Sequence, residues 1–224
     1  MSVPLKVSLP GIRLAWTQWS PLGAETFVRY NVYRREPAVS SAWTRIAAPA
    51  TVGVVTYTDY ATRSRAVYEY AVTVTALLGG IELEGAKQSP PPVGRVEFDT
   101  AFLHDVAAAG SYAQLPSHNV QVSLSQDIAF VPVWGRQQPT AQVGEQIART
   151  ATVTGLPLRS TDAQWADVTE LVRRQRDSAA LLCLRLGRDG LVMFCAVAQS
   201  QKAVGQKSYD PSTELQEVHY TEAV

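Results

Sequence analysis

Apolar and polar residues alternate with a period of two over much of the chain, and this period is typical of half-buried β-strands. Ile12, Leu14 and Trp16 form the first such alternation, and the longest one runs through residues 68–76. The same pattern predicts shorter strands over residues 28–35, 43–46, 56–60 and 81–84. About seven short strands in about ninety residues is the count of a β-sandwich.

The second half of the chain predicts more strands and one helix. Strand patterns occupy residues 95–105, 120–124, 128–134, 147–156 and 214–220. Residues 180–186 and 191–198 flank the turn sequence Gly187–Gly190, which predicts a hairpin. A helix is predicted over about 161–176, because its apolar residues recur at helical spacing and Ser160 or Thr161 can cap its first turn.

Three consecutive prolines lie within Ser89–Gly94 and favour an extended linker, because proline donates no backbone hydrogen bond. We therefore predict a domain boundary here. Residues 1–92 would form a β-sandwich, and residues 93–224 a β-barrel or sandwich with the helix packed on it. The predicted fold class is mainly all-β.

Composition and charge narrow the class of protein. The chain has 224 residues, 46% of them hydrophobic, which is enough to bury a core. Its 20 basic and 20 acidic residues give a net charge of zero, so general nucleic-acid binding is not expected. No apolar run reaches the ~20 residues of a membrane-spanning helix, and the first residues lack the pattern of a secretory signal. We expect synthesis in the cytoplasm and no membrane insertion.

Candidate catalytic and metal-binding groups are few. His104 and Asp105 are adjacent, as a general base or a metal site could require, but the spacing of a zinc motif is absent from the sequence. Carboxylate pairs such as Asp162 and Asp167 lie on predicted elements where solvated charge is expected. The sequence has neither a Gly-x-Ser-x-Gly motif nor a phosphate-binding loop. We predict no enzymatic activity, no cofactor and no metal.

Cys183 and Cys195 flank the predicted hairpin turn. A two-residue loop, Arg188-Asp189 or Asp189-Gly190, keeps the two sulfurs apart. A three-residue loop with Gly190 in a left-handed conformation sets them opposite each other, where a disulfide is conceivable. Folding in the cytoplasm favours reduced, buried thiols. The pattern leaves the register, and therefore the pairing, open.

Several segments of the first half form a recognisable series. In chain order they are Trp16, YNVYRR, WTRIA, TYTDY and YEYAVTVTALLGG. Over residues 5–90 this series resembles a fibronectin type III module. The resemblance implies a β-sandwich in which Trp16 fills the gap between two sheets. It also implies a corner tyrosine whose hydroxyl bonds back to the preceding connection, with Tyr68 the candidate and Tyr70 its rival.

A second series runs through the rest of the chain: FLHD, VPVWGRQQP, VGE, a Trp-bearing helix, LLCLRLGRDGLVMFCAV and ELQEVHYTEAV. Over roughly residues 97–224 this order is similar to the C-terminal domain of minor tail proteins from long-tailed phages of actinobacteria. The resemblance implies a virion component of the tail tip or baseplate, related to barrels that assemble into rings. The fibronectin-like module in front agrees with this, because such modules decorate phage tails.

We therefore expect a structural virion protein that assembles with copies of itself, as a trimer or hexamer ring around the tail axis, and with other tail-tip or baseplate proteins. The fibronectin-like domain would face outward. The candidate interface residues are Leu77, Leu78, Trp43, Tyr220 and Val224. The alternative is a host-envelope or carbohydrate-binding accessory module, whose partner would be a glycan of the host cell surface.

Overall fold

The computed structural model describes residues 7–21, 23–87, 90–116, 120–131, 140–154, 162–201 and 212–219. The chain groups into two compact units. The sandwich unit consists of Ser8–Asp99, Arg185–Val192 and Tyr220–Val224, and the sheet unit of Met1–Val7, Thr100–Leu184 and Met193–His219. The predicted division between residues 92 and 93 stays a prediction, because this grouping follows proximity and not independent folding.

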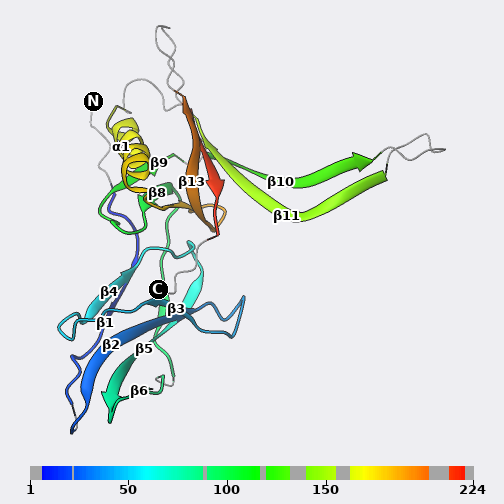
Figure 1. Cartoon of the computed structure of the whole chain (residues 1–224). Helices are drawn as coiled ribbons and strands as arrows, with labels where there is room; N and C mark the ends of the chain where they lie inside the picture. Colours follow the sequence, from blue (N-terminus) through cyan, green and yellow to red (C-terminus); the bar gives the residue numbers. More distant parts are fainter. Residues whose placement is uncertain are drawn as a thin grey trace. The chain divides into compact units, whose positions relative to one another are not determined.

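Two antiparallel sheets form the sandwich unit (Figure 1). The smaller sheet pairs β1 (Ile12–Ala15) with β4 (Thr56–Asp59). The larger sheet has the order β3 (Thr44–Ala47), β2 (Thr26–Arg35), β5 (Val67–Leu78) and β6 (Ile81–Glu84), and β7 (Val93–Arg95) also pairs with β5. Strand β5 is long enough for β6 to pair with its C-terminal end and β7 with its N-terminal end.

The core of the sandwich unit is built from the apolar positions of the period-two strands. Its buried residues are Ile12, Val32, Ile46, Tyr68 and Tyr70. Trp16 is partly buried and packs against this cluster, and its ring centroid lies 5.4 Å from that of Tyr30. The indole therefore lies against the core, as the sequence predicts.

The hydroxyl of Tyr68 makes the bond expected of a corner tyrosine. It accepts a hydrogen bond from the backbone N–H of Arg63, five residues upstream, at 3.0 Å. The rival, Tyr70, instead donates its hydroxyl hydrogen to the carboxylate of Asp59 at 2.9 Å. The predicted bond of Tyr68 to the preceding connection is thus confirmed, and Tyr70 has a different role.

A seven-stranded sheet and a helix form the sheet unit. The strand order is β10 (Val120–Val131), β11 (Thr140–Val153), β14 (Ser212–Glu217), β13 (Leu191–Gln201), β12 (Leu182–Leu186), β8 (Ala101–Asp105) and β9 (Tyr112–Leu115). Helix α1 (Asp162–Ser178) packs against β8 and β9 and buries Val168 and Leu171 (Figure 1). The helix predicted over about 161–176 is confirmed.

One strand prediction is wrong: residues 95–105 do not form a single strand. Strand β7 ends at Arg95 and β8 begins at Ala101, and the two pair in different units. Between them, Ser64 Oγ donates to the carbonyl of Phe98 at 2.6 Å and accepts from its N–H at 3.0 Å. A side chain therefore takes the hydrogen bonds that a continuous ladder would use.

The described chain is mainly β with one helix, which confirms the predicted fold class. Within the same residues, no helix has the length and apolar character that crossing a bilayer requires.

Candidate functional site

A buried polar network in the sandwich unit joins Arg34, Asp59 and Tyr70. Arg34 Nη1 donates to both carboxylate oxygens of Asp59, at 3.0 and 2.9 Å, and Asp59 is 1% exposed. Burial, and next the charge of Asp59, raises the pKa of Tyr70 far above its ordinary value, so its hydroxyl stays a donor. The network links β2, β4 and β5 through hydrogen bonds, and this linkage indicates a structural role.

Arg185 is a second buried group, and sequence reasoning did not single it out. It belongs to the part of the hairpin that lies in the sandwich unit and is fully buried. Its guanidinium donates to the carbonyl of Thr62 at 2.8 Å, to the hydroxyl of Thr62 at 3.0 Å and to the carbonyl of Pro10 at 2.5 Å. The guanidinium also lies 4.5 Å from the ring centroid of Phe98. These contacts anchor the hairpin residues to the sandwich core.

His104 and Asp105 do not form an imidazole–carboxylate pair. His104 Nδ1 lies 3.2 Å from the backbone carbonyl oxygen of Asp105. The Asp105 carboxylate accepts from the backbone N–H groups of Ala107 and Ala108, at 2.9 and 3.2 Å, which is the pattern of a turn cap. The described residues contain no group of three or more His, Cys, Asp or Glu placed to hold a metal ion.

The two cysteines are free thiols and both are buried. Residues Gly187–Gly190 connect their strands, and Gly190 has a φ of +59°, in the left-handed region that glycine favours. Burial raises the pKa of the Cys195 thiol to about 12, so it carries almost no thiolate near neutral pH. A nucleophilic role is therefore not supported for Cys195.

Trp43, a predicted interface residue, is half-buried, and the guanidinium carbon of Arg35 lies 4.4 Å from its ring centroid. Trp19 is also half-buried, with its ring centroid 5.9 Å from that of Phe27. A sugar-binding site needs an open ring face for stacking. Arg35 covers one face of Trp43, which disfavours this residue as a glycan platform.

The predicted hairpin tip is exposed and apolar. Leu77 and Leu78 are 36% and 44% exposed. Leu78 pairs with Ile81 and shares a face with Ile81 and Leu83 of β6, which are 64% and 53% exposed. Leu77 pairs with Glu82 and lies on the opposite face. Glycines at positions 79 and 80 with positive φ make the tight turn between these strands. The tip stays a predicted interface, while Tyr220 and Val224 lie outside the described residues.

A long two-stranded projection, here called the arm, extends from the seven-stranded sheet (Figure 1). Strand β11 pairs with β14 only through residues 150–153. Beyond this point residues 125–131 and 140–148, which define the arm, pair only with each other among the described strands. At ~3.4 Å per residue the arm continues for about 20 Å beyond the third strand.

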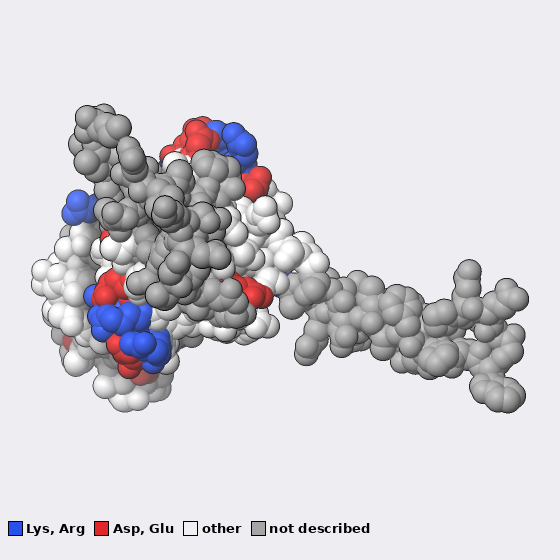
Figure 2. Space-filling model, turned by 90° about the horizontal axis from the view of Figure 1, so that it is seen from above, with Lys and Arg blue, Asp and Glu red and all other residues white. Residues whose placement is uncertain are grey.

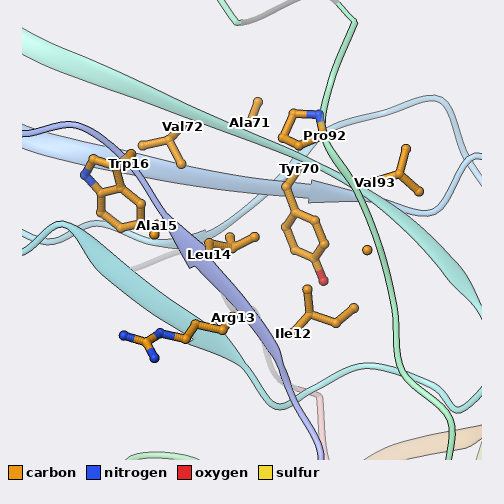
Figure 3. A pocket seen from close by; sticks show the side chains of 11 residues that line it. Ile12, Arg13, Leu14, Ala15, Trp16, Tyr70, Ala71, Val72, Pro92 and Val93 are labelled. Atoms are coloured by element: carbon orange, nitrogen blue, oxygen red, sulfur yellow. The ribbon is translucent and has the colours of Figure 1, made fainter.

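A groove opens along the edge of β1 in the sandwich unit (Figure 3). Its volume is about 320 Å³, and its lining comes from β1, β5 and the start of β7. Tyr70 and Val72 lie on one side, and Leu14 and Trp16 on the other. The Nε1 atom of Trp16 is buried without an acceptor in the structure. The lining of the groove is about as polar as it is apolar, and it lies between strands.

Charged side chains are distributed as mixed pairs. On the face that Figure 2 shows, basic and acidic groups of the described residues lie next to each other. In the sandwich unit, Arg29 pairs with Glu82 at 3.1 Å and Arg65 with Asp99 at 2.7 Å. This mixture gives no support to a field of one sign that would collect nucleic acid.

A scan against protein-family models finds no match to this chain, and a search of curated proteins finds none either.

The surfaces that sequence reasoning missed are the arm and the groove. Little signal for the arm was present, because the strands predicted over residues 120–124, 128–134 and 147–156 have ordinary lengths and leave residues 140–146 of β11 unpredicted. The groove had no such signal. The groove arises because β1 and β7 lie next to each other without being paired among the described strands. No pattern in the sequence of either strand predicts this arrangement.

Proposed function

We propose that this chain is a structural virion protein of a phage tail tip or baseplate, which assembles by repeated contacts with copies of itself and with neighbouring tail proteins. The resemblance of the two halves to a fibronectin type III module and to a minor tail protein domain suggests the setting. The arm is the structural feature that supports assembly as the mechanism.

An isolated two-stranded ladder is marginally stable in water, because neither face nor edge is covered. Over residues 125–131 and 140–148 the arm is a two-stranded ladder without a third strand among the described strands. Its register sets Ile128 opposite Val143 and Phe130 opposite Ala141, so apolar residues stand opposite apolar residues. A partner that covers this ladder would convert a marginal element into a buried one, and burial of apolar area drives association. The arm therefore suits a protein whose work is assembly.

The exposed hairpin tip adds a second contact of the same kind. Leu78, Ile81 and Leu83 are apolar, exposed and on the same face of one hairpin, whereas Leu77 lies on the opposite face. A contiguous apolar patch on a soluble protein marks an interaction site more often than an isolated leucine does. In a ring of copies, each such patch would be buried against a neighbour.

The location in a virion can be tested directly on particles. An antibody raised against the purified chain should label the tail tip or baseplate of phage particles that carry its gene, as seen by electron microscopy. Absence of label from all intact particles would contradict the proposal.

The mechanism can be tested with a variant in which a two-residue Asn-Gly turn replaces residues 126–147. Particles made with this variant should lack the protein, while circular dichroism of the purified variant should show folded β structure. The matched control is Val39→Ser, which changes an exposed apolar residue away from the arm and should be incorporated normally. Normal incorporation of the arm variant would show that the arm does not mediate assembly.

A further inference from the structure

Strand β1 leaves one edge without a partner among the described strands, because it pairs only with β4. The backbone N–H of Trp16 donates to the carbonyl of Val55 at 3.0 Å, which identifies a hydrogen-bonded pair of this ladder. Such pairs alternate along an antiparallel ladder, so every second residue back from Trp16 also bonds to β4. The N–H and C=O groups of Arg13 and Ala15 therefore point to the open edge.

The groove lies along this open edge (Figure 3). Its volume of about 320 Å³ equals that of about ten water molecules at ~30 Å³ each. Val93, on the far wall, is 65% exposed. Apolar side chains such as Leu14 and Val72 beside unpaired backbone groups suit an added β-strand, because the backbone provides the ladder and the side chains contact alternate residues of the new strand.

Among the described residues that precede β1, none completes the edge. The backbone N–H of Val7 donates to Gln114 Oε1 at 3.0 Å, and its carbonyl accepts from the Tyr112 hydroxyl at 3.1 Å. These three residues belong to the sheet unit. Of the described residues before β1, those in the sandwich unit are 8–11, and they are not in a strand.

Arg13 supplies a charge at the same edge. Its side chain is exposed and points away from the core, since its neighbours Ile12 and Leu14 face inward. Among the described residues Arg13 has no ion-pair partner, whereas Arg29 and Arg34 are each paired with a carboxylate. An acidic residue opposite Arg13 on an added strand would stabilise the pairing.

Strand β6 is a second open edge of the same unit, since it pairs only with β5 among the described strands. The N–H of Gly85 donates to the carbonyl of Val74 at 3.0 Å, which sets the phase of the β5–β6 ladder. Counting back by two from Gly85, the residues bonded to β5 are Leu83 and Ile81. The N–H and C=O groups of Glu82 therefore point away from β5, to the open edge.

The side chains of β6 are complementary to the edge of β1, since two are apolar and the one between them is acidic. Ile81 and Leu83 are apolar and more than half exposed, and Glu82 alternates with them on the opposite face. Glu82 already contacts Arg29, but this ion pair is solvent-exposed and such pairs contribute little. Glu82 is therefore available to a second arginine.

We propose that β6 of one copy adds to the open edge of β1 in a second copy, as an antiparallel third strand of its β1–β4 sheet. In the register that sets Arg13 opposite Glu82, Leu14 lies opposite Ile81 and Ile12 opposite Leu83. Arg13 and Glu82 then lie on the outer face of the extended sheet. The four apolar residues of these pairs lie on its inner face. The hydrogen-bond phases agree as well, because Arg13 and Glu82 both direct their backbone groups to the open edge.

This contact is heterologous, because each copy contributes a different edge. Repetition of a heterologous contact closes into a ring or continues as a filament, depending on the rotation between copies. The contact deepens the proposed structural function by naming the two surfaces through which copies meet. It rests on that function only for the expectation that copies associate, and it does not involve the arm.

The test is a charge exchange in the full-length chain, measured by sedimentation velocity over a range of concentrations. Arg13→Glu sets two carboxylates opposite each other, and Glu82→Arg sets two guanidinium groups opposite each other. Each variant alone should associate at least tenfold more weakly than the wild type. An equimolar mixture of the two variants, and the double variant R13E/E82R, should recover association. Glu97→Arg, which makes the same charge change as Glu82→Arg at an exposed residue outside β1 and β6, is the matched control.

Unchanged association of both single variants, or no recovery in the mixture, overturns the proposal. A wild-type chain that stays monomeric at its highest soluble concentration also overturns it, and the groove would then belong to a strand of another protein. Circular dichroism of each variant separates lost association from lost folding. Particle labelling reports on the virion role independently, so tail labelling with charge-insensitive association would leave the proposed function in place and reject only this contact.

Discussion

The centre of the sandwich unit and the arm use the same antiparallel ladder, but they differ in what surrounds it. In the sandwich centre, β5 has β2 along one edge and β6 and β7 along the other, and Tyr68 and Tyr70 fill the core beneath it. Among the described strands, those of the arm pair only with each other. The sandwich centre is stabilised by contacts within the chain. The arm instead has strand edges to which a neighbouring molecule can bind.

The largest expected difference between covered and uncovered β structure is chemical reactivity. Cys195 lies in the covered part of the seven-stranded sheet, and burial raises the pKa of its thiol to about 12. Ser123, near the base of the arm, is exposed. At pH 8 the thiolate fraction of Cys195 should be roughly 10³-fold below that of a thiol with an ordinary pKa near 8.5. Iodoacetamide should therefore label Ser123→Cys roughly 10³-fold faster than Cys195, as followed by mass spectrometry. Equal rates in the native state would contradict this, and equal rates in denaturant are the control.

The next largest effect is expected in the buried network of the sandwich centre. Asp59→Asn removes the carboxylate charge that Arg34 faces, with Asp59 1% exposed. Breaking a buried pair leaves an uncompensated charge, so the free energy of unfolding should fall by about 3 kcal/mol. Urea denaturation measures this change. The control, Glu97→Gln, breaks an exposed ion pair of Arg65 and should cost less than about 1 kcal/mol. A similar loss for both variants would show that burial does not set the difference.

A smaller loss is expected for Tyr68→Phe. The variant keeps the ring in the core and removes the acceptor of the Arg63 N–H, at 3.0 Å. The free energy of unfolding should fall by about 1 kcal/mol, which is the usual net contribution of such a bond. The comparison variant is Tyr33→Phe, which removes an exposed hydroxyl bond to Glu84 and should change stability by less than about 0.5 kcal/mol. Chemical denaturation of both variants should rank them in this order, and the reverse order would refute the corner role of Tyr68.

The smallest effect is expected where the arm begins. Leu124 is 65% exposed on β10, so Leu124→Thr should change the unfolding free energy of the isolated protein by less than about 0.5 kcal/mol. Leu115→Ala, at a fully buried position of the same sheet unit, should cost about 3 kcal/mol. Thermal denaturation of the pair gives the measurement. A large loss for Leu124→Thr would mean that the chain itself covers the base of the arm.

Local patterns predicted much of the fold because they depend on neighbours in sequence. Alternation placed Ile12, Trp16 and Tyr68 toward a core, since successive side chains of a strand point to opposite faces. Helical spacing predicted α1 to within two residues at its C-terminal end, which lies at Ser178. A left-handed Gly190 was one of the alternatives that the turn sequence left open, and the structure gives this residue a φ of +59°.

The candidate surfaces depended on contacts between distant residues, which alternation does not encode. In the sequence pattern Arg185 is an ordinary residue of a predicted strand. In the structure it is buried against Thr62 and Pro10, which are more than a hundred residues away. His104 and Asp105 are adjacent in sequence and nevertheless face different partners. Spacing along the chain could not distinguish these outcomes.

By itself, the amino-acid sequence determined most of the strand segments and which of their faces are apolar, because backbone sterics and side-chain alternation act over a few residues. Only the tertiary structure decided which edges stay open and in which phase their hydrogen bonds point. That phase follows from the pairing of β1 with β4 and of β5 with β6, and a shift of one residue in either pairing would reverse it.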